Sequence, residues 1–138
     1  DFCGTRWQVN AIIIPVPSGK AFMMPVAKIM ALYIKHTGKE YIQVSGVPEN
    51  LDITASRTGT TIYLHVVNFS RVRSTEINLK VNNMSIISAK AFELSTNPEF
   101  EILNAENDPL VTKEKILNIS DNIIFPAASV TAVELTVA

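Results

Sequence analysis

The stretch from Thr60 to Asn68, TTIYLHVVN, constrains the fold more than any other part of the sequence. It is rich in β-branched and aromatic residues and has turn residues on both sides, which predicts a central strand. Successive side chains of a strand point to opposite faces. One face is fully apolar and consists of Ile62, Leu64 and Val66. The other is half apolar and consists of Tyr63, His65 and Val67. We therefore expect both faces of this strand to be covered.

The flanking sequence predicts an antiparallel meander around this strand. Gly59 provides a tight hairpin turn from the preceding alternating run 51–57, and the turn 68–71 leads into a second alternating run, 75–81. Three consecutive strands should therefore pair in chain order. Their apolar faces, together with that of the last strand, should form one core. Its expected members are Ile53, Ile62, Leu64, Val66, Ile77, Leu79, Val133 and Leu135.

The chain from Tyr41 onward predicts strands and no helices. The expected strands are 41–45, 51–57, 60–68, 75–81, 86–94, 115–119 and 129–137. The region 95–112 is rich in turn residues around one short possible strand, 100–103. Short strands with frequent turns indicate a mainly β fold, an antiparallel β-sandwich of jelly-roll or Greek-key type. A chain of 138 residues is long enough for one such core.

The first 39 residues have a different pattern. Val9 to Ile14 is a continuous apolar run, typical of a strand buried in a parallel sheet, and the prolines and glycine of segment 15–20 end it. A helix should begin at Pro25 and end near a C-cap glycine, Gly38. Its apolar stripe at helical spacing consists of Val26, Ile29, Met30 and Tyr33. One β/α unit cannot form a sheet by itself, so we expect residues 1–39 to be the end of something larger, and residues 40–138 to form the sandwich domain.

Composition argues against several classes of partner and cofactor. A net charge of -1 provides no basic surface for nucleic acid, and no apolar run reaches the ~20 residues that cross a membrane. Cys3 is the single cysteine, and Cys3, His36 and His65 do not have metal-ligand spacing, so we expect no disulfide within the chain, no metal and no cofactor. The glycosylation sequons at Asn68, Asn83 and Asn118 are a weak signal.

No residue is assigned a catalytic role. The acidic cluster is the natural place to look for a glycosidase pair, but no apolar pocket is evident that would separate two pKa values, so we expect a solvated turn region. The cluster consists of Glu93, Glu99, Glu101, Glu106 and Asp108. A thiol dyad of Cys3 with a histidine lacks a positioning motif. Most aromatic residues lie inside strand patterns, which favours core packing over a platform for sugars.

Six motifs together resemble the C-terminal end of α-L-arabinofuranosidase-type glycoside hydrolases, in which a (β/α)8 barrel precedes a β-sandwich. Three match the last barrel strand, its loop and the closing helix: VNAIIIP (9–15), FMMP (22–25) and ALYIKHTG (31–38). Three match the sandwich: IYLHVVNFS (62–70), NAENDP (104–109) and FPAASVT (125–131).

The resemblance implies that residues 1–39 are the remnant of a (β/α)8 barrel, its last strand and helix, and that 40–138 is the C-terminal sandwich domain. It also implies a role without catalysis for this chain. In such enzymes the catalytic glutamates lie on earlier barrel strands, and no position here corresponds to them. The parent would be a retaining hydrolase of arabinose-containing polysaccharide, extracellular or periplasmic, and this chain would support its catalytic barrel. The alternative is a free-standing carbohydrate-binding or adhesion sandwich, which an exposed row of aromatic residues would favour.

The two apolar surfaces of the N-terminal segment need partners, because large exposed apolar patches usually mark interfaces. We expect the helix to dock on the half-apolar face of the sandwich, and the strand 9–14 to pair with another edge, as in a two-fold dimer. The candidate domain-interface residues are Tyr63, His65, Val67, Ile29, Met30 and Tyr33.

Overall fold

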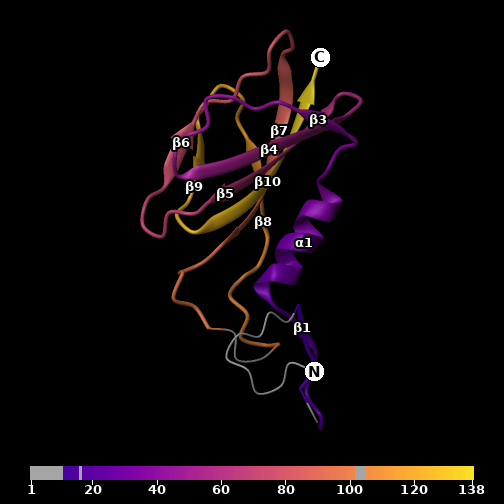
Figure 1. Cartoon of the computed structure of the whole chain (residues 1–138), viewed down its shortest axis with the longest axis vertical. Coiled ribbons are helices and arrows are strands. Elements are labelled where there is room, and N and C mark those ends of the chain that lie inside the picture. The colour runs from indigo at the N-terminus through magenta and orange to yellow at the C-terminus, as the bar shows by residue number, and fades with distance from the viewer. Residues whose placement is uncertain (1–10, 16, 102–104) are drawn as a thin grey trace.

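The strand predicted from residues 60–68 is β5 (Thr61–Asn68) in a computed structural model, which describes residues 11–15, 17–101 and 105–138. It lies inside a six-stranded antiparallel sheet of order β3-β4-β5-β10-β7-β8 (Figure 1). A second antiparallel sheet pairs β6 with β9, and together the sheets form an antiparallel β-sandwich. The other strands are β3 (Glu40–Ile42), β4 (Leu51–Thr58), β6 (Thr75–Ile77), β7 (Ile86–Ser95), β8 (Lys113–Leu117), β9 (Ile123–Phe125) and β10 (Ser129–Val137).

The alternation along β5 follows the prediction. Ile62, Leu64 and Val66 are buried, while Tyr63 and the other residues of the opposite face are half-buried. The predicted core is also confirmed. Ile62, Leu64, Val66, Val133 and Leu135 lie in one buried cluster, and Ile53, Ile77 and Leu79 pack against it.

The predicted three-strand meander is wrong in its third strand. The hairpin from β4 to β5 is present, and Gly59 at its turn has a φ of +59°. The other neighbour of β5 is β10, with Leu64 opposite Val133, whereas β6 pairs with β9, which was not predicted. The nine-residue β10 has apolar side chains on both faces, and a central position buries both; Ala132 and Val133 are fully buried. Phe100 is not in a strand, and residues 102–104 of the possible strand lie outside the described part of the chain.

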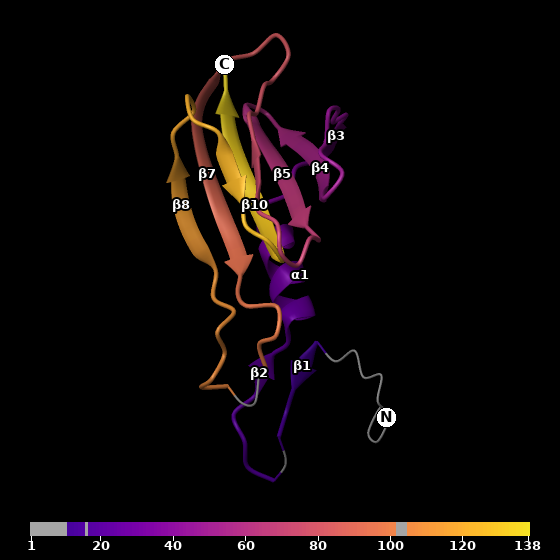
Figure 2. The same cartoon turned by 90° about the vertical axis from the view of Figure 1, so that its left-hand side faces the viewer.

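The N-terminal strand also differs from the prediction. Residues 9 and 10 lie outside the described part, and β1 (Ile12–Ile13) pairs antiparallel with β2 (Phe22–Met23) in a hairpin, not in a parallel sheet. The proline-rich segment after β1 reverses the chain, since the Gly19 N–H donates to the Pro15 carbonyl at 3.1 Å. Figure 2 shows this hairpin beyond the end of the six-stranded sheet.

The predicted helix is α1 (Pro25–Lys35), which begins at Pro25 as expected, but its C-cap residue is His36 rather than a glycine. Gly38 has a different reason to be glycine: a Cβ there would lie 2.5 Å from backbone atoms of Arg57 on β4. No helix in the described ranges is long and apolar enough to cross a membrane.

Candidate domain interface around helix α1

Helix α1 covers the outer face of the six-stranded sheet. Adjacent residues of β10 lie on opposite faces of this sheet. Val133 belongs to the core on the face toward β6 and β9, and Ala132 belongs to a second buried cluster that also contains Leu32 of α1. Ile29 and Tyr33 pack against this second cluster. The predicted docking of the helix on the sandwich is therefore confirmed.

The face that the helix buries is rotated from the predicted stripe. Ile29, Leu32, Tyr33 and His36 are spaced three and four residues apart, so they share one side of the helix, and this side contacts the sheet. Met30 is 56% exposed and Val26 is 37% exposed, so both lie on the opposite side. Both sides of the helix include Ile29 and Tyr33, and both have side chains three and four residues apart. Periodicity alone could therefore not show that Leu32 and His36, rather than Val26 and Met30, complete the side that contacts the sheet.

Tyr33 anchors the helix to β5. Its ring stacks on His65 with centroids 3.9 Å apart and an interplanar angle of 4°, and its hydroxyl donates to the Val66 carbonyl at 3.4 Å. Burial, with a smaller contribution from the negative charge of Asp52, raises the pKa of Tyr33 to about 12. The hydroxyl therefore stays protonated and able to donate at neutral pH.

His36 forms the second anchor, just after the last turn. Its ring stacks on Phe92 of β7 at 4.0 Å, and its Nδ1 lies 2.8 Å from Oε1 of Glu134 on β10. The His36 carbonyl lies 2.7 Å from Nε2 of His65. A carbonyl can only accept, so this Nε2 carries a proton, which fixes the tautomer of a neutral His65. Stacking and hydrogen bonds to three strands together hold the C-terminal end of α1 against the sheet.

The other end of α1 contacts the loop between β7 and β8. The Lys28 ammonium group forms an ion pair with Asp108 and also donates to the Leu110 carbonyl. Leu110 is buried in the second cluster, against which Phe100 of the same loop packs. The loop and the sheet therefore both contribute to the site on which the helix lies.

The side of α1 that faces away from the sheet is apolar and exposed. Val26, Met30 and Ile34 are four residues apart, so they form one stripe along the helix, and Ile34 is 73% exposed. The β1–β2 hairpin continues from the N-terminal end of α1 (Figure 2) and adds exposed Ile12, Ile14 and Met23. We call these six residues the apolar stripe.

The six candidate interface residues are thus divided between two surfaces. Ile29, Tyr33 and His65 meet in the contact between helix and sheet, and Tyr63 and Val67 lie half-buried on the same face of β5. Met30 belongs to the apolar stripe. Their role as an interface with a separate domain stays a prediction. The prediction missed Leu32 and His36 on the helix side, and Glu134 and Phe92 on strands far away in sequence.

The acidic cluster does not form one site. Glu93 was expected in a solvated turn, but it is 4% exposed on β7, where its carboxylate contacts the Lys115 ammonium group and the Ser95 hydroxyl, each at 2.5 Å. Lysine from the neighbouring strand makes this burial possible, because a buried carboxylate needs a partner. Glu99 and Asp108 form separate ion pairs with Arg71 and Lys28.

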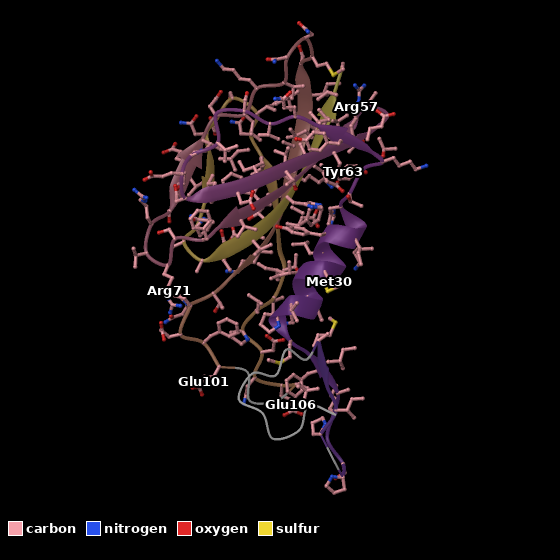
Figure 3. The ribbon with its side chains drawn as sticks, viewed as in Figure 1. Met30, Arg57, Tyr63, Arg71, Glu101 and Glu106 are labelled. Atoms are coloured by element: carbon pink, nitrogen blue, oxygen red, sulfur yellow. The ribbon has the colours of Figure 1, made fainter. Side chains whose placement is uncertain are left out.

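The remaining acidic residues of the cluster lie in the β7–β8 loop. Figure 3 shows Glu101 and Glu106 in this loop, below the sheet that carries Tyr63. Among the described residues, no three His, Cys, Asp or Glu side chains are grouped in a way that could hold a metal ion. Cys3, the thiol of the possible dyad with a histidine, lies outside the described residues.

No family model matches the chain, and no curated protein sequence matches it. Solved structures do. An arabinose-bound GH51 α-L-arabinofuranosidase matches over 97% of this chain and 22% of its own, with a TM-score of 0.74 and 18% identity. The chain shares the fold of that arabinofuranosidase region. The α-L-arabinofuranosidase of Thermotoga maritima matches over 84% of this chain and 30% of its own, with a TM-score of 0.64 and 18% identity.

The likeness extends to another class of glycoside hydrolase. A family 30 xylanase from Clostridium acetobutylicum matches over 78% of this chain and 26% of its own, with a TM-score of 0.55 and 13% identity. The chain spans between 22% and 31% of the length of these solved structures and of two further arabinofuranosidases. The resemblance in fold to part of an arabinofuranosidase-type glycoside hydrolase is therefore confirmed.

Proposed function

We propose that this chain is the C-terminal region of an α-L-arabinofuranosidase-like glycoside hydrolase that acts on arabinose-containing polysaccharide. Residues 40–138 would form its sandwich domain, of jelly-roll type, and residues 1–39 would be the end of its catalytic barrel. The chain would support the barrel without taking part in catalysis. The observation that carries this proposal is the match to arabinofuranosidase structures over most of this chain and a minor part of theirs.

The apolar stripe supports the structural role. Three side chains on α1 and three on the β1–β2 hairpin are 37–73% exposed, which is costly for an apolar surface that stays in water. The opposite side of the same helix is fixed to the sheet by two ring stacks. A helix that is apolar on both sides is suited to lie between two layers, with the sandwich on one side and the barrel on the other.

The alternative of a free-standing sugar-binding module would need a row of exposed aromatic side chains. Tyr41 is 79% exposed and Phe69 is 60% exposed, but they do not form such a row. Tyr41 pairs with Ser56, which pairs with Tyr63, so Tyr41 lies beside the middle of β5. Phe69 lies just beyond the end of β5, six positions from Tyr63, which is roughly 20 Å along the strand direction. Within residues 11–15, 17–101 and 105–138, no row of exposed aromatic side chains supports this alternative.

The proposal is tested first by the gene sequence upstream of this segment, where two glutamates at the ends of barrel-strand patterns are expected. The purified 138-residue chain should not hydrolyse an aryl α-L-arabinofuranoside. Hydrolysis that a single Glu→Gln substitution within the chain abolishes would refute the role without catalysis.

The role of the stripe is tested in the full gene product. The double substitution Met30→Glu and Ile34→Glu should lower the stability and activity of the hydrolase, whereas Val72→Asp, at a residue 93% exposed, should not. Light scattering on the 138-residue chain, with and without residues 1–39, tests the other partner we expected, a second copy bound through the N-terminal segment. A dimer that the deletion abolishes would assign the stripe to self-association.

A further inference from the structure

The glycosylation sequons lie in different environments in the folded chain. Asn68 is 1% exposed, and its side-chain nitrogen donates to two carbonyls, that of Arg73 at 2.9 Å and that of Phe125 at 3.1 Å. An amide nitrogen has two hydrogens, and a glycosidic bond replaces one of them. A glycan at Asn68 would therefore break a buried hydrogen bond, so the fold has no place for one at this position.

Asn118 is exposed and keeps a hydrogen for such a bond. It lies in the turn between β8 and β9, where its Nδ2 donates to Oδ2 of Asp121 at 3.0 Å and its Oδ1 accepts from the Ser120 hydroxyl at 2.9 Å. The Asp121 N–H also donates to the Asn118 carbonyl at 3.1 Å. Within the described ranges, Asp121 is the one acceptor for this Nδ2. A sugar can therefore replace its second hydrogen while the turn keeps all of these hydrogen bonds.

Asn118 directly follows the free edge of the six-stranded sheet. β8 pairs with β7 on one side and has no neighbour on the other side in the described part of the chain (Figure 2). Residues 113–115 of this strand are charged, which discourages pairing with another edge. The rest of the edge has no charge, and Ile116 is 84% exposed and Ile119, inside the sequon, 46% exposed. A free edge with exposed isoleucines promotes association unless something polar covers it.

We propose that Asn118 carries an N-linked oligosaccharide, which covers the uncharged half of the β8 edge. The donor is an oligosaccharide attached to a polyprenyl diphosphate. A bond forms between C1 of the first sugar and Nδ2 of Asn118 as the bond between C1 and the diphosphate oxygen breaks. The diphosphate leaves, and Nδ2 loses one proton.

A bulky, hydrated glycan at this position keeps a second strand edge away from Ile116 and Ile119. The proposal requires export of the chain through a eukaryotic secretory pathway, where the transferase and its donor are found. It does not rest on the hydrolase function, so the two proposals can fail separately.

The first test is occupancy of the site when a eukaryotic host makes the 138-residue chain behind a secretion signal. Peptide mass spectrometry of the chain from medium and cells should find a glycan at Asn118 in most molecules. Ser120→Ala keeps Asn118 but removes the sequon and should lose this glycan completely, whereas Ser120→Thr keeps the sequon and should keep the glycan. An unmodified Asn118 in the unchanged chain would overturn the proposal.

The second test is self-association of the two Ser120 variants, in a Ser85→Ala background that removes the exposed sequon at Asn83. In dilution series followed by light scattering, Ser120→Ala from the eukaryotic host should associate at about tenfold lower concentration than Ser120→Thr. Adding Ile116→Lys to Ser120→Ala should restore the monomer, which would locate the contact at β8 rather than at the apolar stripe. Both variants made in bacteria lack the glycan and should associate alike.

Three results would overturn the covering of the edge. Equal association of the two variants from the eukaryotic host would show that the glycan protects nothing. Association that Ile116→Lys leaves unchanged would place the contact away from β8. An equally large difference between the bacterial proteins would assign the effect to the side chain at position 120 rather than to the glycan.

Discussion

Leu64 is the residue whose truncation most directly tests the register of the central strand. It is 6% exposed and lies opposite Ala55 on one side and Val133 on the other. Its side chain also helps to line an open groove of about 620 Å³ between the large sheet and β6. Leu64→Ala removes three carbon atoms, which at about 0.8 kcal/mol each corresponds to a loss of roughly 2.4 kcal/mol. A closed cavity would raise the loss toward about 5 kcal/mol.

The groove decides between these values. Because the space beside Leu64 is already open, truncation enlarges an existing groove rather than creating an enclosed cavity, so we expect a loss of about 2 to 3 kcal/mol. Urea denaturation followed by circular dichroism measures it, and Ile116→Ala, at a residue 84% exposed on β8, is the matched control, with an expected change of less than about 0.5 kcal/mol.

Two outcomes for Leu64→Ala would contradict the reasoning. A loss below about 0.5 kcal/mol would mean that the register of β5 is shifted by one residue, because such a shift moves every side chain to the other face. A loss near 5 kcal/mol would mean that the groove is closed in solution.

Three further predictions follow from single positions. The pKa of Tyr33 is about 12 in the folded chain and 10.0 in the reference state. The stability that the neutral hydroxyl provides is therefore full below pH 10 and decreases as the pH rises toward 12. Urea melts at a series of pH values should show this loss in the unchanged chain and not in Tyr33→Phe. Asn68 is 1% exposed, and its amide donates to the carbonyls of Arg73 and Phe125. After secretion of the chain from a eukaryotic host, peptide mass spectrometry should therefore find no glycan at Asn68. A glycan at Asn68 would mean that this end of β5 is not folded as described. Gly38→Ala should cost about 1 to 3 kcal/mol in thermal melts through the clash with β4, and an unchanged melting temperature would show that the approach is looser.

The elements that the sequence predicted well are those whose signal is local. Period-2 alternation located β4, β5, β7 and β10 to within one residue or so, and Pro25 located the start of α1. The same alternation assigned Ile62, Leu64 and Val66 to the core correctly, because which side chains share a face of a strand depends only on their spacing.

Strand partners required the tertiary structure. Nothing between residues 60 and 81 distinguishes a meander from the observed arrangement, in which β10 inserts beside β5 and β6 pairs with β9. The place beside β5, in the centre of the sheet, goes to the strand that buries the most apolar surface there, although β10 is more than 60 residues away along the chain. The three-residue β6 buries less apolar surface than the nine-residue β10. The apolar run before Pro15 was similarly misassigned, because a run of isoleucines does not reveal whether its partner is a parallel strand or a hairpin.

The candidate interface shows the same division. The sequence by itself determined that α1 is apolar around much of its surface and that β5 has a half-apolar outer face with His65 at its middle. Only the tertiary structure decided that Tyr33 and His36, rather than Val26 and Met30, face the sheet. The physical reason is that helical spacing leaves two overlapping apolar sides nearly equivalent. The choice depends on ring stacks with His65 and Phe92 and on a contact with Glu134, which lies 98 residues from His36 along the chain. These residues become neighbours of the helix only when the strands assemble.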